Sequence, residues 1–187
     1  LLSPCFAEIL ISTNHPERYA ELGLRCVPDR FPGRGPLAGV HAALAAASSD
    51  WVFAIASDMP FFSGEYALHM QAVIEASEPH EAGRDPTQKK QAGKAIGALG
   101  SVTESGAHIE PFLAYYARTI LPLLESLLAS GDQATRGPSF PDLLALAPTL
   151  RIPEDSARAY TPDWRLFSSL NTPEDFALRS GSNAIGP

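Results

Sequence analysis

The sequence is poor in cysteine and in long apolar stretches, and each shortage excludes a class of protein. Only two cysteines occur among the 187 residues, and they do not form a CxxC pair. A disulfide framework and a cysteine-based zinc site are therefore not expected, and a reducing cytosol fits the composition. No apolar run reaches the length of about 18 residues that a membrane span needs. The first residues, LLSPCFAEILI, lack the basic leading region of a signal peptide and carry Glu8. We expect a cytoplasmic protein that does not contact a membrane.

Positive charge is also scarce. The chain has 14 Lys and Arg against 21 Asp and Glu, a formal net charge of −7, and no basic stripe. A nucleic-acid backbone would be repelled, so no nucleic acid is expected as a partner. A small phosphate ligand is still compatible, because a local pocket can oppose the overall charge. With 45% hydrophobic and 19% charged residues, the chain is typical of a single globular domain.

Predicted strands and helices alternate through the first half of the chain. Apolar runs at Glu8–Ser12 and Leu24–Pro28 predict two strands, and Trp51–Ala56, apolar on both faces, predicts a central parallel strand covered by helices on each side. The alanine-rich segment Leu37–Ser48 and the segment Ser63–Ala76, with its serine cap, predict helices. The alternation favours an α/β fold with a mostly parallel central sheet and helices on both faces.

The second half is less regular. Charge, proline and glycine in Glu78–Lys94 predict a loop, and Thr119–Ser130 predicts an amphipathic helix. The remaining predictions are strands at Ala95–Ser101, Ile109–Tyr116, Thr149–Ile152 and Leu166–Leu170, a polar turn between the first two of these, a short helix at Pro16–Leu22, a last helix opening at Asn171, and a disordered tail over residues 180–187.

Polar residues follow three of the predicted strands: Ser12 to Asn14, Asp29, and Ser57-Asp58. In an open α/β sheet, ligands bind at the carboxyl ends of the strands. Asp58 comes directly after a buried strand and before Met59-Pro60, so it is held on rigid scaffold. Such a carboxylate suits Mg²⁺, which takes one or two protein carboxylates and completes its shell with water and phosphate oxygens. The alternative is that Asp58 caps the next helix or a turn, and the spacing does not decide between the two.

The segment Gly33–Gly39, GRGPLAG, leads into the alanine-rich helix. Its backbone N–H groups and the positive end of the helix dipole favour an anion there, and its glycines allow a bulky ligand to approach the backbone. A plain turn before a helix is the alternative reading, and the Gly-Lys-Ser/Thr ending of a Walker loop is absent. Within the helix, His41 is expected to be a packed or surface residue, and Tyr115-Tyr116 to pack against the core at a strand end.

Taken in order, EILISTN, VPDRFPGRGPLAG, WVFAIASDMPF, EPFLAYYARTILPLLESLLASG and LFSSLNTPEDF resemble the molybdenum cofactor guanylyltransferase (MobA) family over nearly the whole chain. The GPLAG segment followed by a strand that ends in Asp-x-Pro is the most specific part. The resemblance implies a Rossmann-like nucleotidyltransferase fold. It also implies that GTP and molybdopterin, or Mo-molybdopterin, are joined into the guanine dinucleotide cofactor with release of pyrophosphate, with Mg²⁺ as the metal.

The resemblance also implies site residues. Asp58 matches the family's magnesium ligand and is the implied catalytic residue. Residues implied at the nucleotide are Ser12, which stands where the family commonly has asparagine, Asn14, Asp29 and Asp58. Residues implied at the pterin are Gly35, Gly39, Ser169 and Asn171.

One departure from the family lies at the front of the chain. Family members begin with a strand, a Gly-rich loop and a helix that bind the triphosphate, and this unit is expected to be missing from the otherwise single domain of residues 1–187. Truncation, omission and true loss are all open explanations, and little activity is expected if the protein begins at Leu1. The alternatives to guanylyl transfer are a cytidylyl- or sugar-phosphate nucleotidyltransferase and a degenerate, non-catalytic molybdopterin-binding paralogue. Cofactor-insertion proteins and molybdoenzymes are the implied protein partners.

Overall fold

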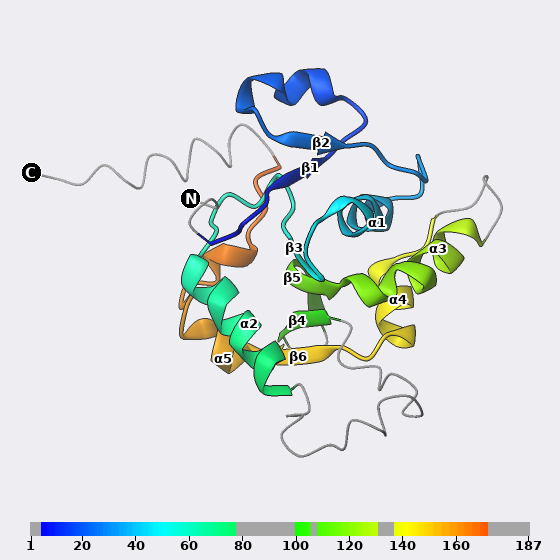
Figure 1. The fold of residues 1–187 in the computed structure, drawn as a ribbon. Coiled ribbons are helices and arrows are strands. Elements are labelled where there is room, and N and C mark those ends of the chain that lie inside the picture. The colour runs from blue at the N-terminus through cyan, green and yellow to red at the C-terminus, as the bar shows by residue number, and fades with distance from the viewer. Residues whose placement is uncertain (1–4, 78–99, 106–107, 131–136, 172–187) are drawn as a thin grey trace, which may run out of the picture.

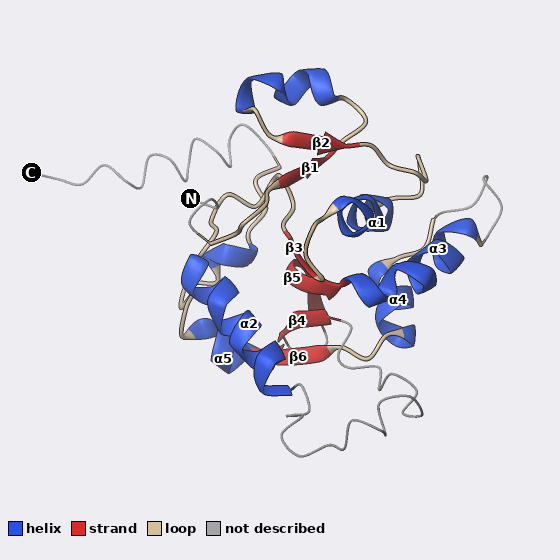
Figure 2. Cartoon of the chain, viewed as in Figure 1, coloured by secondary structure: helices blue, strands red, loops and turns tan. Residues whose placement is uncertain are grey.

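Helices flank a sheet on both sides in the computed structural model, which describes residues 5–77, 100–105, 108–130 and 137–171 (Figures 1 and 2). The strands are β1 (Leu10–Ser12), β2 (Arg25–Val27), β3 (Trp51–Ala54), β4 (Gly100–Ser105), β5 (His108–Ala117) and β6 (Leu150–Pro153). The α-helices are α1 (Pro36–Ala46), α2 (Gly64–Ser77), α3 (Leu121–Ala129), α4 (Phe140–Leu146) and α5 (Glu154–Arg158). Short 3₁₀ helices are η1 (Pro16–Leu22), η3 (Arg118–Ile120) and η4 (Arg165–Phe167). None of the helices in the described ranges has the length and apolar character needed to cross a bilayer.

The described strands form a parallel pair, β1-β2, and a four-stranded sheet in the order β3-β5-β4-β6. Because β5 is antiparallel to both β3 and β4 while β6 is parallel to β4, the strands β3, β4 and β6 share one direction and β5 alone opposes it. The predominant strand direction is therefore as expected. The prediction of a central parallel strand at Trp51–Ala56 is wrong, since β3 is the end strand of this sheet among the described residues and pairs with an antiparallel neighbour. The apolar sequence of β3 reflects the packing of other elements on both of its faces. It does not indicate whether the neighbouring strand is parallel or antiparallel.

Two apolar cores lie on opposite faces of the four-stranded sheet. One packs α1, α3 and α4 against the sheet and includes Leu37, Leu44, Leu124 and Phe140. The other packs α2, α5 and η4 and is built from other residues, among them Met59, Tyr66, Met70 and Leu166. The prediction of helices on both faces is thereby confirmed (Figure 2).

Strand β5 supplies both cores through the alternation of its side chains. Tyr116 and Ala114 face the first core, whereas Tyr115 and Leu113 face the second. The expected packing of the two tyrosines is confirmed, because they are 7% and 2% exposed. Burial raises the pKa of Tyr115 to about 12 and also raises the pKa of Tyr116. The register of β4 on β5 shifts between Ser101 and Thr103, and on β5 this bulge contains Leu113, a buried non-glycine residue with φ of 55°.

Two further predictions are wrong. β4 extends through Ser105, so much of the polar turn expected after residue 101 is strand. The strand expected at Leu166–Leu170 is absent from that segment, where η4 forms instead and the Trp164 and Phe167 rings lie 4.6 Å apart. Aromatic packing thus overrides the β propensity of this stretch. The loop at Glu78–Lys94 and the tail at 180–187 lie outside the described residues, as does all but the first residue of the last helix.

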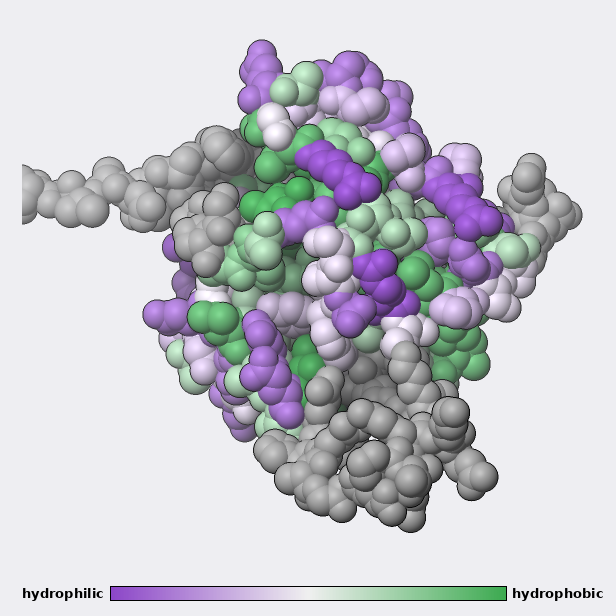
Figure 3. Space-filling view, in the orientation of Figure 1, coloured by the Kyte–Doolittle hydropathy of each residue, from purple (hydrophilic) through white to green (hydrophobic). Residues whose placement is uncertain are grey.

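The η1 segment projects from the rest of the chain. It contains no buried residue, and in the space-filling view this region at the top is largely hydrophilic (Figure 3). It links β1 to β2, and the parallel pairing of these strands brings the polar residues that follow each of them to one place.

Candidate active site

Three of the implied nucleotide residues form a single hydrogen-bonded cluster at the ends of β1 and β2. The backbone N–H of Asp29 donates to Asn14 Oδ1 at 2.9 Å, and Asn14 Nδ2 donates to Asp29 Oδ2 at 3.4 Å. Ser12 Oγ donates to Asp29 Oδ1 at 3.2 Å. The parallel register of Ser12 with Val27 explains why residues so far apart in sequence meet. Ser12 and Asn14 are exposed and Asp29 is half-buried, so this cluster is open to a ligand from solvent.

The segment between Asp29 and α1 makes a sharp turn that depends on glycine. Gly33 and Gly35 have φ of 77° and 80°, and Gly35 is the residue from which α1 begins. A side chain is strained at such angles. The space around both Cα atoms is open, with no heavy atom within 4 Å of a Cβ built there. The backbone at the start of α1 is therefore accessible to a ligand, and the anion-receptive helix end expected from the sequence is present as geometry.

Gly39 lies on α1, next to the cluster at Asp29. A Cβ built on Gly39 would lie 3.1 Å from Ser12 Oγ. The glycine thus allows α1 to pack closely against the end of β1. This contact joins one implied pterin residue to one implied nucleotide residue.

Asp58 lies in the segment that follows β3. It is half-buried, and Met59, which is 6% exposed, anchors the turn through its backbone N–H to Ala56 O at 3.1 Å. Asp58 does not cap the next helix: Ser63 Oγ accepts the backbone N–H of Tyr66 at 3.2 Å at the start of α2. Among the contacts of the described residues, the Asp58 carboxylate takes part in no hydrogen bond or ion pair. The helix-capping alternative is therefore excluded, and the carboxylate is available to a ligand.

The segment after η4 lies against the segment that carries Asp58. The backbone N–H of Leu170 donates to Asp58 O at 2.8 Å. This bond places Ser169 and Asn171, both exposed, on either side of the residue that contacts Asp58. The structure thus brings Asp58, Ser169 and Asn171 together.

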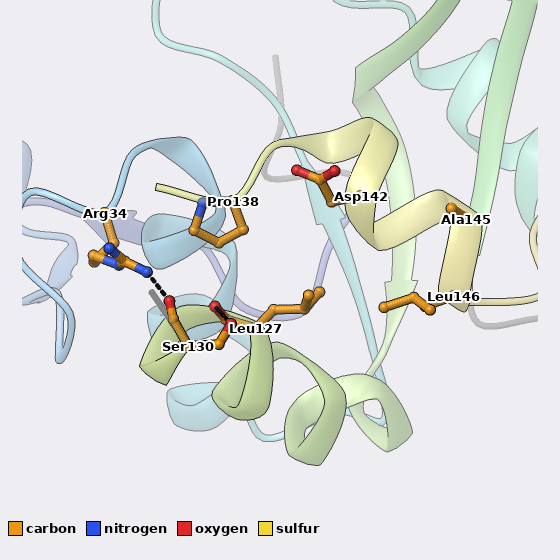
Figure 4. Close-up of a pocket in the computed structure, with 7 residues that line it drawn as sticks. All are labelled: Arg34, Leu127, Ser130, Pro138, Asp142, Ala145 and Leu146. Carbon is orange, nitrogen blue, oxygen red and sulfur yellow. Dashed lines mark hydrogen bonds between the residues drawn. The ribbon is translucent and has the colours of Figure 1, made fainter. Parts of the chain in front are cut away.

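The candidate residues form two groups, one hydrogen-bonded around Asp29 and one around Asp58. Two pockets of the described part of the chain are lined by other residues. A pocket of about 470 Å³ lies between α3 and α4 (Figure 4). Another, of about 270 Å³, lies beside Phe61 and Arg165. Phe61 follows Asp58 by a few residues in the sequence. Within the described ranges, no group of three or more His, Cys, Asp and Glu side chains could hold a metal, so a metal would depend on Asp58 together with water or ligand oxygens.

A family profile for the MobA-like NTP transferase domain matches residues 1–139. The chain belongs to this family. It is 37% identical over 174 residues to a protein named probable molybdenum cofactor guanylyltransferase from Peptoclostridium acidaminophilum, covering 93% of this chain and 70% of that one. It is 34% identical over 175 residues to the molybdenum cofactor guanylyltransferase of Syntrophotalea carbinolica, covering 94% and 72%. The resemblance inferred from the motifs is confirmed.

A solved structure supports the fold. The chain is similar to molybdopterin-guanine dinucleotide biosynthesis protein A from Archaeoglobus fulgidus, with a TM-score of 0.64, 21% identity, and coverage of 92% of this chain and 77% of that one. At this identity the similarity concerns the fold, and the expected Rossmann-like nucleotidyltransferase fold is confirmed.

The contacts of α3 with α1 and with the segment before it were not predicted from the sequence. Arg30 Nη1 donates to Glu125 Oε1 at 2.8 Å, and the buried His41, 1% exposed, lies 3.4 Å from the same oxygen through Nε2. Arg34 also reaches α3. The indication of these contacts in the sequence was Arg34, an arginine between two glycines of the GRGPLAG segment.

Proposed function

We propose that this protein transfers GMP from GTP to molybdopterin, or to Mo-molybdopterin, and releases pyrophosphate. The observation that carries the proposal is the similarity, over 93% of the chain, to a relative named as a probable molybdenum cofactor guanylyltransferase. The motifs that carry the resemblance also hold every candidate site residue. The same similarity favours guanylyl transfer over cytidylyl or sugar-phosphate transfer.

The chemistry needs no general base. The terminal phosphate of molybdopterin is a monoester with a second pKa near 6, so it is already mostly dianionic at neutral pH. One of its oxygens forms a bond to the α-phosphorus of GTP while the bond from that phosphorus to the pyrophosphate oxygen breaks. The obstacle is repulsion between two anions and the negative charge that develops on the leaving group.

Asp58 fits a role as the magnesium ligand. It is a half-buried carboxylate on a segment fixed by Met59 and by the Leu170 hydrogen bond, and its oxygens have no partner among the described residues. A single carboxylate suits Mg²⁺, which fills its other positions with water and phosphate oxygens. Bound Mg²⁺ would supply positive charge next to the phosphates.

We assign residues of both groups to each of the two substrates. We assign Ser12, Asn14 and Asp29 to the nucleotide, with Asp58, and we assign Gly35, Gly39, Ser169 and Asn171 to the pterin. The contact of Gly39 with Ser12 and the open backbone at Gly35 support a shared border between the two substrates on α1. We place the protein in the cytoplasm, where its two free thiols stay reduced, and cofactor-insertion proteins and molybdoenzymes are proposed recipients of the product.

A nucleotide panel tests the proposal. The full-length protein is incubated with molybdopterin, Mg²⁺ and GTP, CTP or ATP in turn, and the dinucleotide product and pyrophosphate are quantified. We expect product with GTP and far less with the other two nucleotides. Product with CTP alone would identify a cytidylyltransferase. Binding of molybdopterin in calorimetry with no product from any nucleotide would identify a non-catalytic binding protein.

A further inference from the structure

The GRGPLAG segment is held by hydrogen bonds from Arg34 to the C-terminal end of α3. Arg34 is half-buried, whereas its neighbours Gly33 and Gly35 are exposed. Its Nε donates to Leu128 O at 3.0 Å. Its Nη2 donates to Ser130 O, the bond drawn in Figure 4. These carbonyls belong to the last turn of α3 and the residue just after it, where carbonyls lack a partner within the helix. One guanidinium therefore binds the segment to the C-terminal end of a helix, where positive charge is favoured.

A second contact holds the same segment through its backbone. A Cβ built on Gly137 would lie 2.5 Å from Arg34 O and 2.8 Å from Arg34 C. Only a residue without a side chain fits there. Arg34 is thus fixed by its side chain on α3 and by its main chain against Gly137.

These contacts matter because the segment itself has little intrinsic rigidity. No heavy atom lies within 4 Å of a Cβ built on Gly33 or Gly35, so no packing of neighbouring groups surrounds these positions, and glycine is the residue with the greatest conformational freedom. Without the Arg34 contacts, the chain between the two glycines would sample many conformations. The start of α1 and the open backbone at Gly35 would then be correctly placed for only part of the time.

We propose that Arg34 is a positioning residue, which acts through the backbone of Gly33–Gly35 to fix the pterin side of the active site. The inference rests on the proposed function for the identity of the ligand. It assigns Arg34 no contact with substrate: the guanidinium is engaged with α3. Its effect is to raise the fraction of molecules in which the segment is competent to bind.

Kinetics of Arg34→Ala and Gly137→Ala in the full-length protein test this role. If the segment is competent for only a tenth of the time, the apparent affinity falls about tenfold. We expect KM for molybdopterin to rise by about tenfold in both variants, with kcat within about twofold of the unaltered protein, because a bound substrate restores the same geometry. Arg34→Lys, which keeps the charge but not the two-pronged donor, should lie between.

Arg118 provides a matched control. Its guanidinium also binds backbone carbonyls at a helix end, donating to Ala47 O and Ser49 O beyond the C-terminus of α1, the end remote from Gly35. Arg118→Ala should lower thermal stability at least as much as Arg34→Ala, yet leave KM for molybdopterin unchanged. An equal rise in KM in both alanine variants, or no rise in Arg34→Ala, would overturn the proposal.

Hydrogen exchange gives a readout that does not depend on activity. The amides of residues 33–39 should exchange faster in Arg34→Ala and Gly137→Ala than in Arg118→Ala. If the unaltered protein forms no product from any nucleotide, the proposed function fails, and hydrogen exchange then decides the positioning role alone: faster exchange supports it and unchanged exchange refutes it.

Discussion

Two hydrogen bonds between Asn14 and Asp29 fix one of the carboxylates of the candidate site. The Asn14 side chain accepts from the Asp29 backbone and donates to its carboxylate, so both ends of Asp29 are constrained by one amide. Because Asn14 is exposed, water can replace it at small cost in stability. Asn14 therefore contributes to the position of the Asp29 carboxylate rather than to the stability of the fold.

Substitution at Asn14 should therefore affect substrate binding more than folding. Asn14→Ala removes both hydrogen bonds, and Asn14→Asp places a second carboxylate beside that of Asp29, where like charges repel. We expect KM for GTP to rise in Asn14→Ala and to rise further in Asn14→Asp. Urea unfolding should change by less than about 1 kcal/mol in Asn14→Ala, as is usual for exposed positions. Equal KM values in all three proteins would contradict a role for this pair at the nucleotide.

At the scale of elements, the sequence predicted what depends on local pattern. The apolar run of β3, the serine cap of α2 and the alternation of Tyr115 and Tyr116 each follow from neighbouring residues, and each is present. The bulge of β5 was not predicted, because the φ of 55° at Leu113 is imposed by the packing of β4 and by both cores. The missed α4 and α5 are only 7 and 5 residues long, too short for a clear helical period.

Substitution of Gly100 tests how closely β4 and β5 approach each other. It pairs with Tyr116, and a Cβ at this position would lie 2.8 Å from Tyr115 O, a backbone atom that cannot rotate away. We expect Gly100→Ala to destabilise the protein by about 1–3 kcal/mol, the usual cost of overpacking, as measured by urea unfolding. Leu68→Ala on α2, where the side chain is 56% exposed, should be close to neutral. If both variants unfold at the same urea concentration as the unaltered protein, the close packing of β4 on β5 at Gly100 would be contradicted.

At the scale of the whole molecule, contacts between distant segments surround the candidate site, and these contacts were not predictable from one sequence. The bond from Arg34 to Leu128 spans 94 positions, and the bond from Arg30 to Glu125 spans 95. A local reading places residues on elements but carries no information on which helix an exposed arginine will reach. The places of the candidate residues, by contrast, were predictable, because they follow strands or stand in the motifs that carry the resemblance, and their roles stay predictions.

The buried tyrosines predict how the whole molecule responds to alkali. Burial raises the pKa of Tyr66 and of Tyr115 to about 12, against about 10 for an unfolded tyrosine. Above pH 10 the unfolded chain loses these protons and the folded protein keeps them, so ionisation favours unfolding. We expect stability to be level below pH 10 and to fall between pH 10 and 12, by roughly 2–3 kcal/mol for each such tyrosine at most. Urea unfolding across this range measures the slope, and Tyr66→Phe should reduce it; an unchanged slope in that variant would show that Tyr66 does not contribute.

The most direct test of the account concerns Asp58. In the full-length protein with GTP, molybdopterin and Mg²⁺, Asp58→Ala should lower turnover by about 10²-fold or more. Asp58→Asn should behave similarly, because it keeps the shape but loses the charge. Asp50, 94% exposed just before the start of β3, is the control, and Asp50→Ala should turn over normally. Normal turnover by Asp58→Ala at unchanged thermal stability would contradict the central claim that this carboxylate holds the metal ion of the transferase.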